Sequence, residues 1–149
     1  MAGTDHDIST LNSLIATTID SIAGYSEAAK EADSRRFVDL FEARAAERRR
    51  AVGYLQDEVT RLGGTPKGDG TVLAGAHRAF LNLKSGLTGK NDAAIVAEVD
   101  RGEDHIKAKY EAALADTVLS AEVRAAVQTC FESVELGHAE MRSLKLATG

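Results

Sequence analysis

The fold is decided by the stretch "LNSLIATTIDSIAGYSEAA" (residues 11–29) and by the segment that follows it. Apolar and small side chains recur in this stretch at steps of three and four residues, which is the spacing of one face of an α-helix. The members of this face are Leu11, Leu14, Ile15, Thr18, Ile22, Tyr25 and Ala29. The pattern predicts a helix over residues 9–32, with Asp7 or Ser9 as its N-cap and a tight turn at "ADS" after it.

A second helix is predicted over residues 34–62. Its apolar stripe contains Phe37, Leu40, Phe41, Ala51, Val52, Leu55, Val59 and Leu62. It ends at "GGTPKGDG" (63–70), where glycines stop the helix and the only proline of the chain follows. Two helices of similar length joined by so short a turn form an antiparallel hairpin.

The second half of the chain repeats this arrangement. A short amphipathic helix is predicted over residues 71–85, and two longer helices are predicted over 91–115 and 120–146. The apolar positions of the two longer helices are Ile95, Val96, Val99, Ile106, Tyr110 and Ala113, and Val123, Val127, Cys130, Val134, Met141 and Leu144. Because only a few residues separate these two helices, they form a second hairpin.

Two long hairpins joined by a long connection predict an all-α protein, a four-helix bundle with ferritin-like connectivity. In that topology the connection runs the length of the bundle, and residues 71–85 form a crossover helix within it. A five-helix array, with that segment as an equal member, is the competing topology. We expect residues 1–7 to be a disordered N-terminus and residues 8–146 to form one domain.

Composition limits the classes of function. The 149 residues carry a formal net charge of −5, whereas nucleic-acid-binding proteins usually present a basic face. No apolar run approaches the roughly 20 residues of a membrane span. The start of the chain has no leader-like segment and Cys130 is the only cysteine, so we expect a cytoplasmic protein. The pattern identifies no phosphate loop, no Ser/His/Asp constellation and no small-molecule substrate.

A di-metal centre is the first site to consider in such a bundle, with iron or manganese as its metal. It needs an inward Glu from each of two helices and an inward Glu-x-x-His from each of the others. The candidate ligands are Glu47, Glu103, Glu135 and His138, of which the last two form a Glu-x-x-His pattern. Helical phase, however, places the carboxylates of the first helix on its outer face and turns Glu135 away from the core. The sequence therefore favours a protein without a cofactor and keeps the metal site as the alternative.

The stretch "EVDRGEDHIKAKY" (98–110) gathers acidic residues and a histidine on one predicted helix. Helical phase places Glu103 beside the apolar stripe, and it places Glu98, Asp100, Asp104 and His105 away from it. This helix is therefore expected to send one carboxylate into the core.

A buried carboxylate needs a partner, because an unpaired buried charge costs several kcal/mol. Arg48, with Arg44 as the second candidate, points inward from another helix. We predict an inter-helix ion pair between Arg48 and Glu103, with Tyr110 or His138 nearby. The pair either fixes helix register or belongs to a polar pocket for a ligand. Gly102 is predicted to let a neighbouring backbone approach closely.

Four segments resemble a family of small bacterial ferritin-like four-helix-bundle proteins of unknown function. They are "LNSLIATTIDSIAGYSEAA", "LFEARAAERR", "LGGTPKGDGTVLAGAHRAFLNLK" and "VDRGEDHIKAKYEAAL". The more specific points are the Gly-Gly-x-Pro loop, the His77-Arg78 pair and the motif at residues 101–104, and the resemblance covers about residues 8–146. It implies the bundle fold and a bacterial cytoplasmic protein, and it implies no particular activity.

Two hypotheses follow. The first is a non-catalytic bundle that associates with copies of itself and has a stress-related or scaffolding role. The second is a metal-binding or oxidoreductase-like protein with a degenerate carboxylate–histidine site.

Overall fold

The computed structural model describes residues 2–70 and 92–148. Within these residues the chain forms four helices and no strand: α1 (Ala2–Glu31), α2 (Arg35–Arg61), α4 (Asp92–Leu114) and α5 (Ala121–Thr148). The all-α prediction is confirmed. The predicted ends of α2, α4 and α5 lie within two residues of those observed. The short helix expected at 71–85, and with it the choice between crossover and fifth bundle member, lies outside the described residues.

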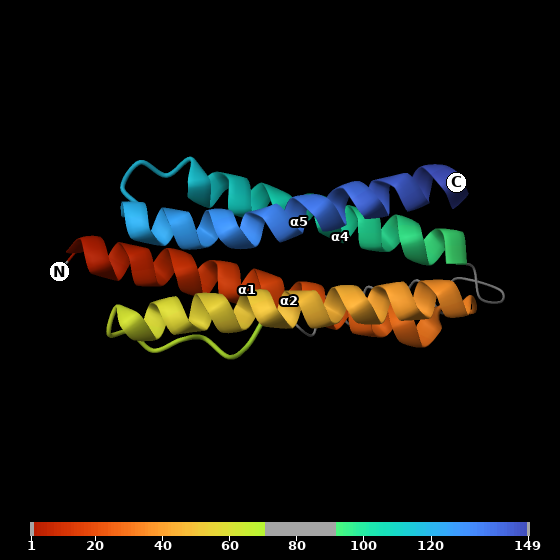
Figure 1. Cartoon of the computed structure of the whole chain (residues 1–149), viewed down its shortest axis with the longest axis horizontal. Helices are drawn as coiled ribbons and strands as arrows, with labels where there is room; N and C mark the ends of the chain where they lie inside the picture. Colours follow the sequence, from red (N-terminus) through yellow and green to blue (C-terminus); the bar gives the residue numbers. More distant parts are fainter. Residues whose placement is uncertain (1, 71–91, 149) are drawn as a thin grey trace.

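The helices form two layers, each consisting of one hairpin (Figure 1). One layer holds α1 and α2, and the other holds α4 and α5; α1 packs on α4 and α2 packs on α5. α2 and α4 therefore lie diagonally across the bundle. Figure 1 also shows that the end of α2 and the start of α4 lie at opposite ends of the bundle, so these two helices run in the same direction.

Local contacts explain where the helices end. Gly63 closes α2 with φ 85°, a left-handed conformation that favours glycine, and its N–H donates to the carbonyl of Thr60. At the other end of the bundle, the turn between α1 and α2 is tied to α4. The backbone N–H groups of Asp33 and Ser34 donate to the two carboxylate oxygens of Asp92, at 2.9 and 3.0 Å.

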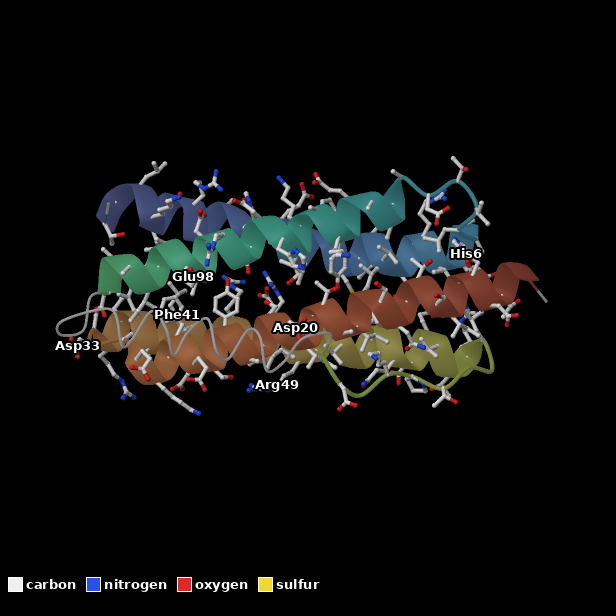
Figure 2. The ribbon with its side chains drawn as sticks, turned by 180° about the vertical axis from the view of Figure 1, so that it is seen from behind. His6, Asp20, Asp33, Phe41, Arg49 and Glu98 are labelled. Carbon is white, nitrogen blue, oxygen red and sulfur yellow. The ribbon has the colours of Figure 1, made fainter. Side chains whose placement is uncertain are left out.

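α1 begins at Ala2, seven residues before the predicted start at residue 9, and residues 2–7 are helical rather than disordered. Two contacts with the turn between α4 and α5 account for the difference. His6 Nε2 lies 2.6 Å from Asp116 Oδ2, and Asp7, only 4% exposed, accepts a hydrogen bond from the N–H of Ser120. Figure 2 shows His6 at this end of the bundle. Asp7 therefore assists the start of α5 and is not the N-cap of α1.

The core consists of two apolar clusters. The first core cluster includes Leu11, Ile15, Leu55, Val59, Ile106, Tyr110, Val127 and Val134. The second core cluster includes Tyr25, Phe37, Phe41, Val96, Val99, Met141 and Leu144. Every one of the four helices contributes to both clusters. None of the described helices combines the length and the apolar character that crossing a bilayer would require.

Candidate functional site

The main polar feature of the interior joins α2 to α4 across the diagonal of the bundle. Arg48 Nη1 donates to Glu103 Oε1 at 2.9 Å, and Arg48 Nη2 donates to Glu103 Oε2 at 2.8 Å. The two residues are 0% and 1% exposed. The structure thus brings together the two residues of the predicted pair, in the bidentate geometry that a guanidinium and a carboxylate favour.

Two side chains of α1 complete this buried network. Ser21 Oγ accepts a hydrogen bond from Arg48 Nη1 at 2.8 Å, and the Tyr25 hydroxyl donates to Glu103 Oε1 at 2.7 Å. The Arg48 guanidinium also lies 5.6 Å from the centroid of the Tyr25 ring, within the range of a cation–π contact. Burial and the neighbouring Glu103 charge raise the pKa of Tyr25 well above its ordinary value, so this hydroxyl keeps its proton and donates.

A glycine on α5 provides the space for the pair. A Cβ atom built on Gly137 would lie 2.6 Å from Arg48 Nη2 and 3.4 Å from Glu103 Oε2. Gly102, by contrast, has nothing within 4 Å of a Cβ built there. The backbone approach predicted at Gly102 is therefore wrong, because Gly102 lies on the exposed side of α4. The glycine with close neighbours is Gly137, which faces the core and is approached by side chains.

Arg44 lies one turn before Arg48 but binds different partners. Its guanidinium donates to Glu47 at 2.7 Å and to Glu140 on α5. Glu47 also accepts a hydrogen bond from Ser133. Arg44 and Glu47 therefore belong to a separate polar group between α2 and α5, at the edge of the bundle.

Asp100 differs from its prediction. It was expected to point away from the core, but it is 1% exposed. It lies on the side of α4 that packs on α5, where Arg142 Nε approaches Asp100 Oδ1 to 2.9 Å and Lys145 lies 3.5 Å from Oδ2. These long cationic side chains cover and neutralise the carboxylate, an arrangement that the phase of α4 alone does not reveal.

The remaining predicted residues lie apart from the buried pair. His138 Nε2 lies 2.6 Å from Asp104 Oδ1, and this contact lowers the pKa of Asp104. Glu135 is exposed. Tyr110 is buried, but its hydroxyl bonds to Thr18 at 2.8 Å and not to Glu103.

The four candidate metal ligands do not meet. In the part of the chain that the structure describes, no group of three or more His, Cys, Asp or Glu side chains is placed to hold a metal ion. Glu103 in particular has both carboxylate oxygens bound by donors from Arg48 and Tyr25. The donor set arranged here therefore does not fit a di-metal centre.

Three contributors to the site were not identified from the sequence. The periodicity places Tyr25 on the apolar stripe of its helix. A tyrosine at such a position can also donate a hydrogen bond inside the core, and this was the available signal. Ser21, next to that stripe, gave a weaker signal of the same kind. Gly137 gave none, because a glycine in a helix does not indicate which side chain fills the space beside it.

These features define an all-α bundle whose interior holds a bidentate arginine–glutamate pair. Residues 6–116 match the family described as Domain of unknown function (DUF2383), and the chain belongs to this family. The matched region contains Ser21, Tyr25, Arg48 and Glu103, and it ends before α5, which carries Gly137. No curated protein matches the chain.

Proposed function

We propose that the chain is a ferritin-like bundle protein of the bacterial cytoplasm that acts without catalysis, by associating with copies of itself. Such an assembly would have a scaffolding or stress-related role. The directions of the helices support the ferritin-like part of the proposal. α2 and α4 run in the same direction, so that the end of α2 and the start of α4 lie at opposite ends of the bundle, as in ferritin-like folds.

The chemistry of the interior supports a non-catalytic role. A general acid or base needs a titratable group within reach of a substrate. The buried carboxylate of Glu103 is bound by Arg48 and Tyr25, and no part of it is accessible to a substrate. Its role in the proposal is to fix how α2 and α4 align.

Exposed apolar side chains carry the self-association part of the proposal. Leu136 and Leu146 on α5 are 70% and 77% exposed, and Tyr54 on α2 is 47% exposed. Single exposed apolar residues are common, but Tyr54 and Leu136 lie seven residues after Glu47 and three after Ser133, which bond to each other between α2 and α5, so helical phase puts both on the α2–α5 side. Exposed apolar residues that share one side of a protein are candidates for burial against another protein.

Sedimentation and light scattering over a series of protein concentrations test this proposal. We expect a dimer or larger species that dissociates on dilution. Leu136→Lys should shift the distribution toward the monomer, whereas Ala108→Lys, at an exposed position of α4, should leave it unchanged. A wild-type protein that remains monomeric at every concentration contradicts the proposal.

Elemental analysis of protein purified without chelator tests the metal-binding alternative. Iron or manganese in a stoichiometric amount, lost on Glu103→Gln, would support the alternative and contradict a cofactor-free bundle.

A further inference from the structure

We infer that a second copy of this chain packs on the α2–α5 face, about a two-fold axis parallel to the helices, so that α2 of each copy lies on α5 of the other. The inference rests on the proposed self-association and adds its geometry. The exposed residues of the α2–α5 face include Arg36, Asp39, Ala43, Arg50 and Tyr54 from α2, and Thr129, Glu132, Leu136, Ser143 and Ala147 from α5. This face is turned toward the viewer in Figure 1.

The contacts between α2 and α5 fix which residues of this face lie at the same level. Cys130 Sγ approaches the carbonyl of Ala51 to 3.9 Å, and Arg61 lies 3.1 Å from Glu122. Because the two helices are antiparallel, Arg50 lies within one turn of the level of Glu132. The α2 half of the face thus has an exposed cation at the level where the α5 half has an exposed carboxylate.

Arg50 and Glu132 are both exposed, and within the described ranges neither takes part in an ion pair. Rotation about a two-fold axis parallel to the helices leaves the position of every residue along the bundle unchanged. It places the α2 half of one copy against the α5 half of the other. It therefore places Arg50 of each copy opposite Glu132 of the other, and this contact occurs twice in the dimer.

The other simple two-fold arrangement has its axis across the helices and sets α2 against α2. It also sets the α5 halves against each other, and because the exposed α5 residues of this face include no cation, Glu132 is left unpaired. Charge complementarity therefore selects the axis parallel to the helices.

The apolar residues of the face suit the same arrangement. Leu136 lies a short distance along α5 from Glu132, so it meets α2 of the second copy between Ala43 and Arg50. Ala43 leaves room for the leucine side chain, and the methylene groups of Arg50 offer apolar surface beside it.

The area of the face is sufficient for a stable dimer. α2 and α5 contain 27 and 28 residues. Helices of that length extend about 40 Å, and two helices side by side are about 20 Å wide. The resulting area of about 800 Å² per partner equals that of a standard protein–protein interface.

Charge reversal tests this geometry. In Arg50→Glu the two contacts become Glu against Glu, and in Glu132→Arg they become Arg against Arg. Each variant alone should raise the dimer dissociation constant on the order of 10-fold or more. An equimolar mixture of the two variants should form a heterodimer with wild-type affinity, because both of its contacts again join opposite charges.

Lys109→Glu, a charge reversal at an exposed position of α4, is the matched control and should leave the dissociation constant unchanged. If the wild type dimerises but the two single variants dimerise equally well, the inferred geometry is wrong and self-association stands. A mixture that stays as dissociated as its components also overturns the geometry. A monomeric wild type overturns both the geometry and the proposed function.

Discussion

Arg48 and Glu103 lie almost wholly inside the bundle and satisfy each other's charge. Removing one partner leaves the other charge buried and unpaired, which costs about 3–5 kcal/mol in buried pairs. We therefore expect Arg48→Met and Glu103→Gln to destabilise strongly when made singly. The double variant should be less destabilised than either single variant, because no uncompensated charge remains. Denaturant unfolding of the four proteins measures these differences in the free energy of unfolding.

Tyr25→Phe is a useful companion variant, because it removes one hydrogen bond to Glu103 and leaves the ion pair in place. It should cost about 1–3 kcal/mol. Strictly additive losses for Arg48→Met and Glu103→Gln would show that the two charges do not depend on each other.

Gly137→Ala tests the space beside the pair. Its Cβ would lie 2.6 Å from Arg48 Nη2, so the guanidinium has to move away from Glu103. We expect a loss of about 1–3 kcal/mol, as for other overpacked interiors. Gly102→Ala is the matched control, since it meets nothing within 4 Å and raises helix propensity, by up to about 1 kcal/mol. Equal effects of the two substitutions on the denaturation midpoint would contradict this assignment.

At the residue scale, the sequence was informative where a side chain follows the phase of its own helix. Arg48 and Glu103 fall on the inner sides of their helices, so their meeting could be predicted. Asp100 could not be placed in the same way, because its burial depends on Arg142 and Lys145 reaching over it from α5. The need for a glycine at position 137 could not be predicted either, because it arises from the Arg48 side chain of α2.

At the scale of elements, two histidine–aspartate contacts connect neighbouring segments. His138 on α5 contacts Asp104 on α4, and His6 on α1 contacts Asp116 in the turn after α4. The hydrogen bond from His138 lowers the pKa of Asp104. The backbone N–H of Val118, followed by His6, lowers the pKa of Asp116.

These directions predict sensitivity to acid. A carboxylate whose folded-state pKa lies below its unfolded value stabilises the fold fully above the unfolded pKa, about 3.9 for Asp. This contribution is lost as the pH falls through the lower, folded-state pKa. The free energy of unfolding should therefore decrease less with acidification in Asp104→Asn than in the wild type. Asp57→Asn, at an exposed position of α2, is the control and should follow the wild type. Parallel curves for all three proteins would contradict the prediction.

The helices themselves were largely predictable, because their period and their stop signals are local properties of the chain. "GGTPKGDG" marks the end of α2, and Gly63 has the positive φ that such an end requires. The start of α1 was not predictable, since its first turns are held by Asp116 and Ser120, more than 100 residues away.

For the whole molecule, the two core clusters should unfold together, because each of the four helices crosses both. The chain has three tyrosines and no tryptophan. Tyr110 belongs to the first core cluster and Tyr25 to the second. In Tyr25→Phe the remaining buried tyrosine reports on the first cluster, and in Tyr110→Phe it reports on the second. Within each variant we expect the fluorescence midpoint to coincide with the loss of helix by circular dichroism. Separate midpoints would show that the clusters unfold independently.

Gly137 also has a consequence for how the bundle assembles. If α5 docked one residue out of step, Leu136 or His138 would occupy the place where the Arg48 guanidinium lies, and the arginine would be forced away from Glu103. The misdocked chain would then hold an unpaired carboxylate in its interior and would unfold again more readily than the native bundle. We therefore expect Gly137 to favour the correct register of α5 by destabilising the shifted ones.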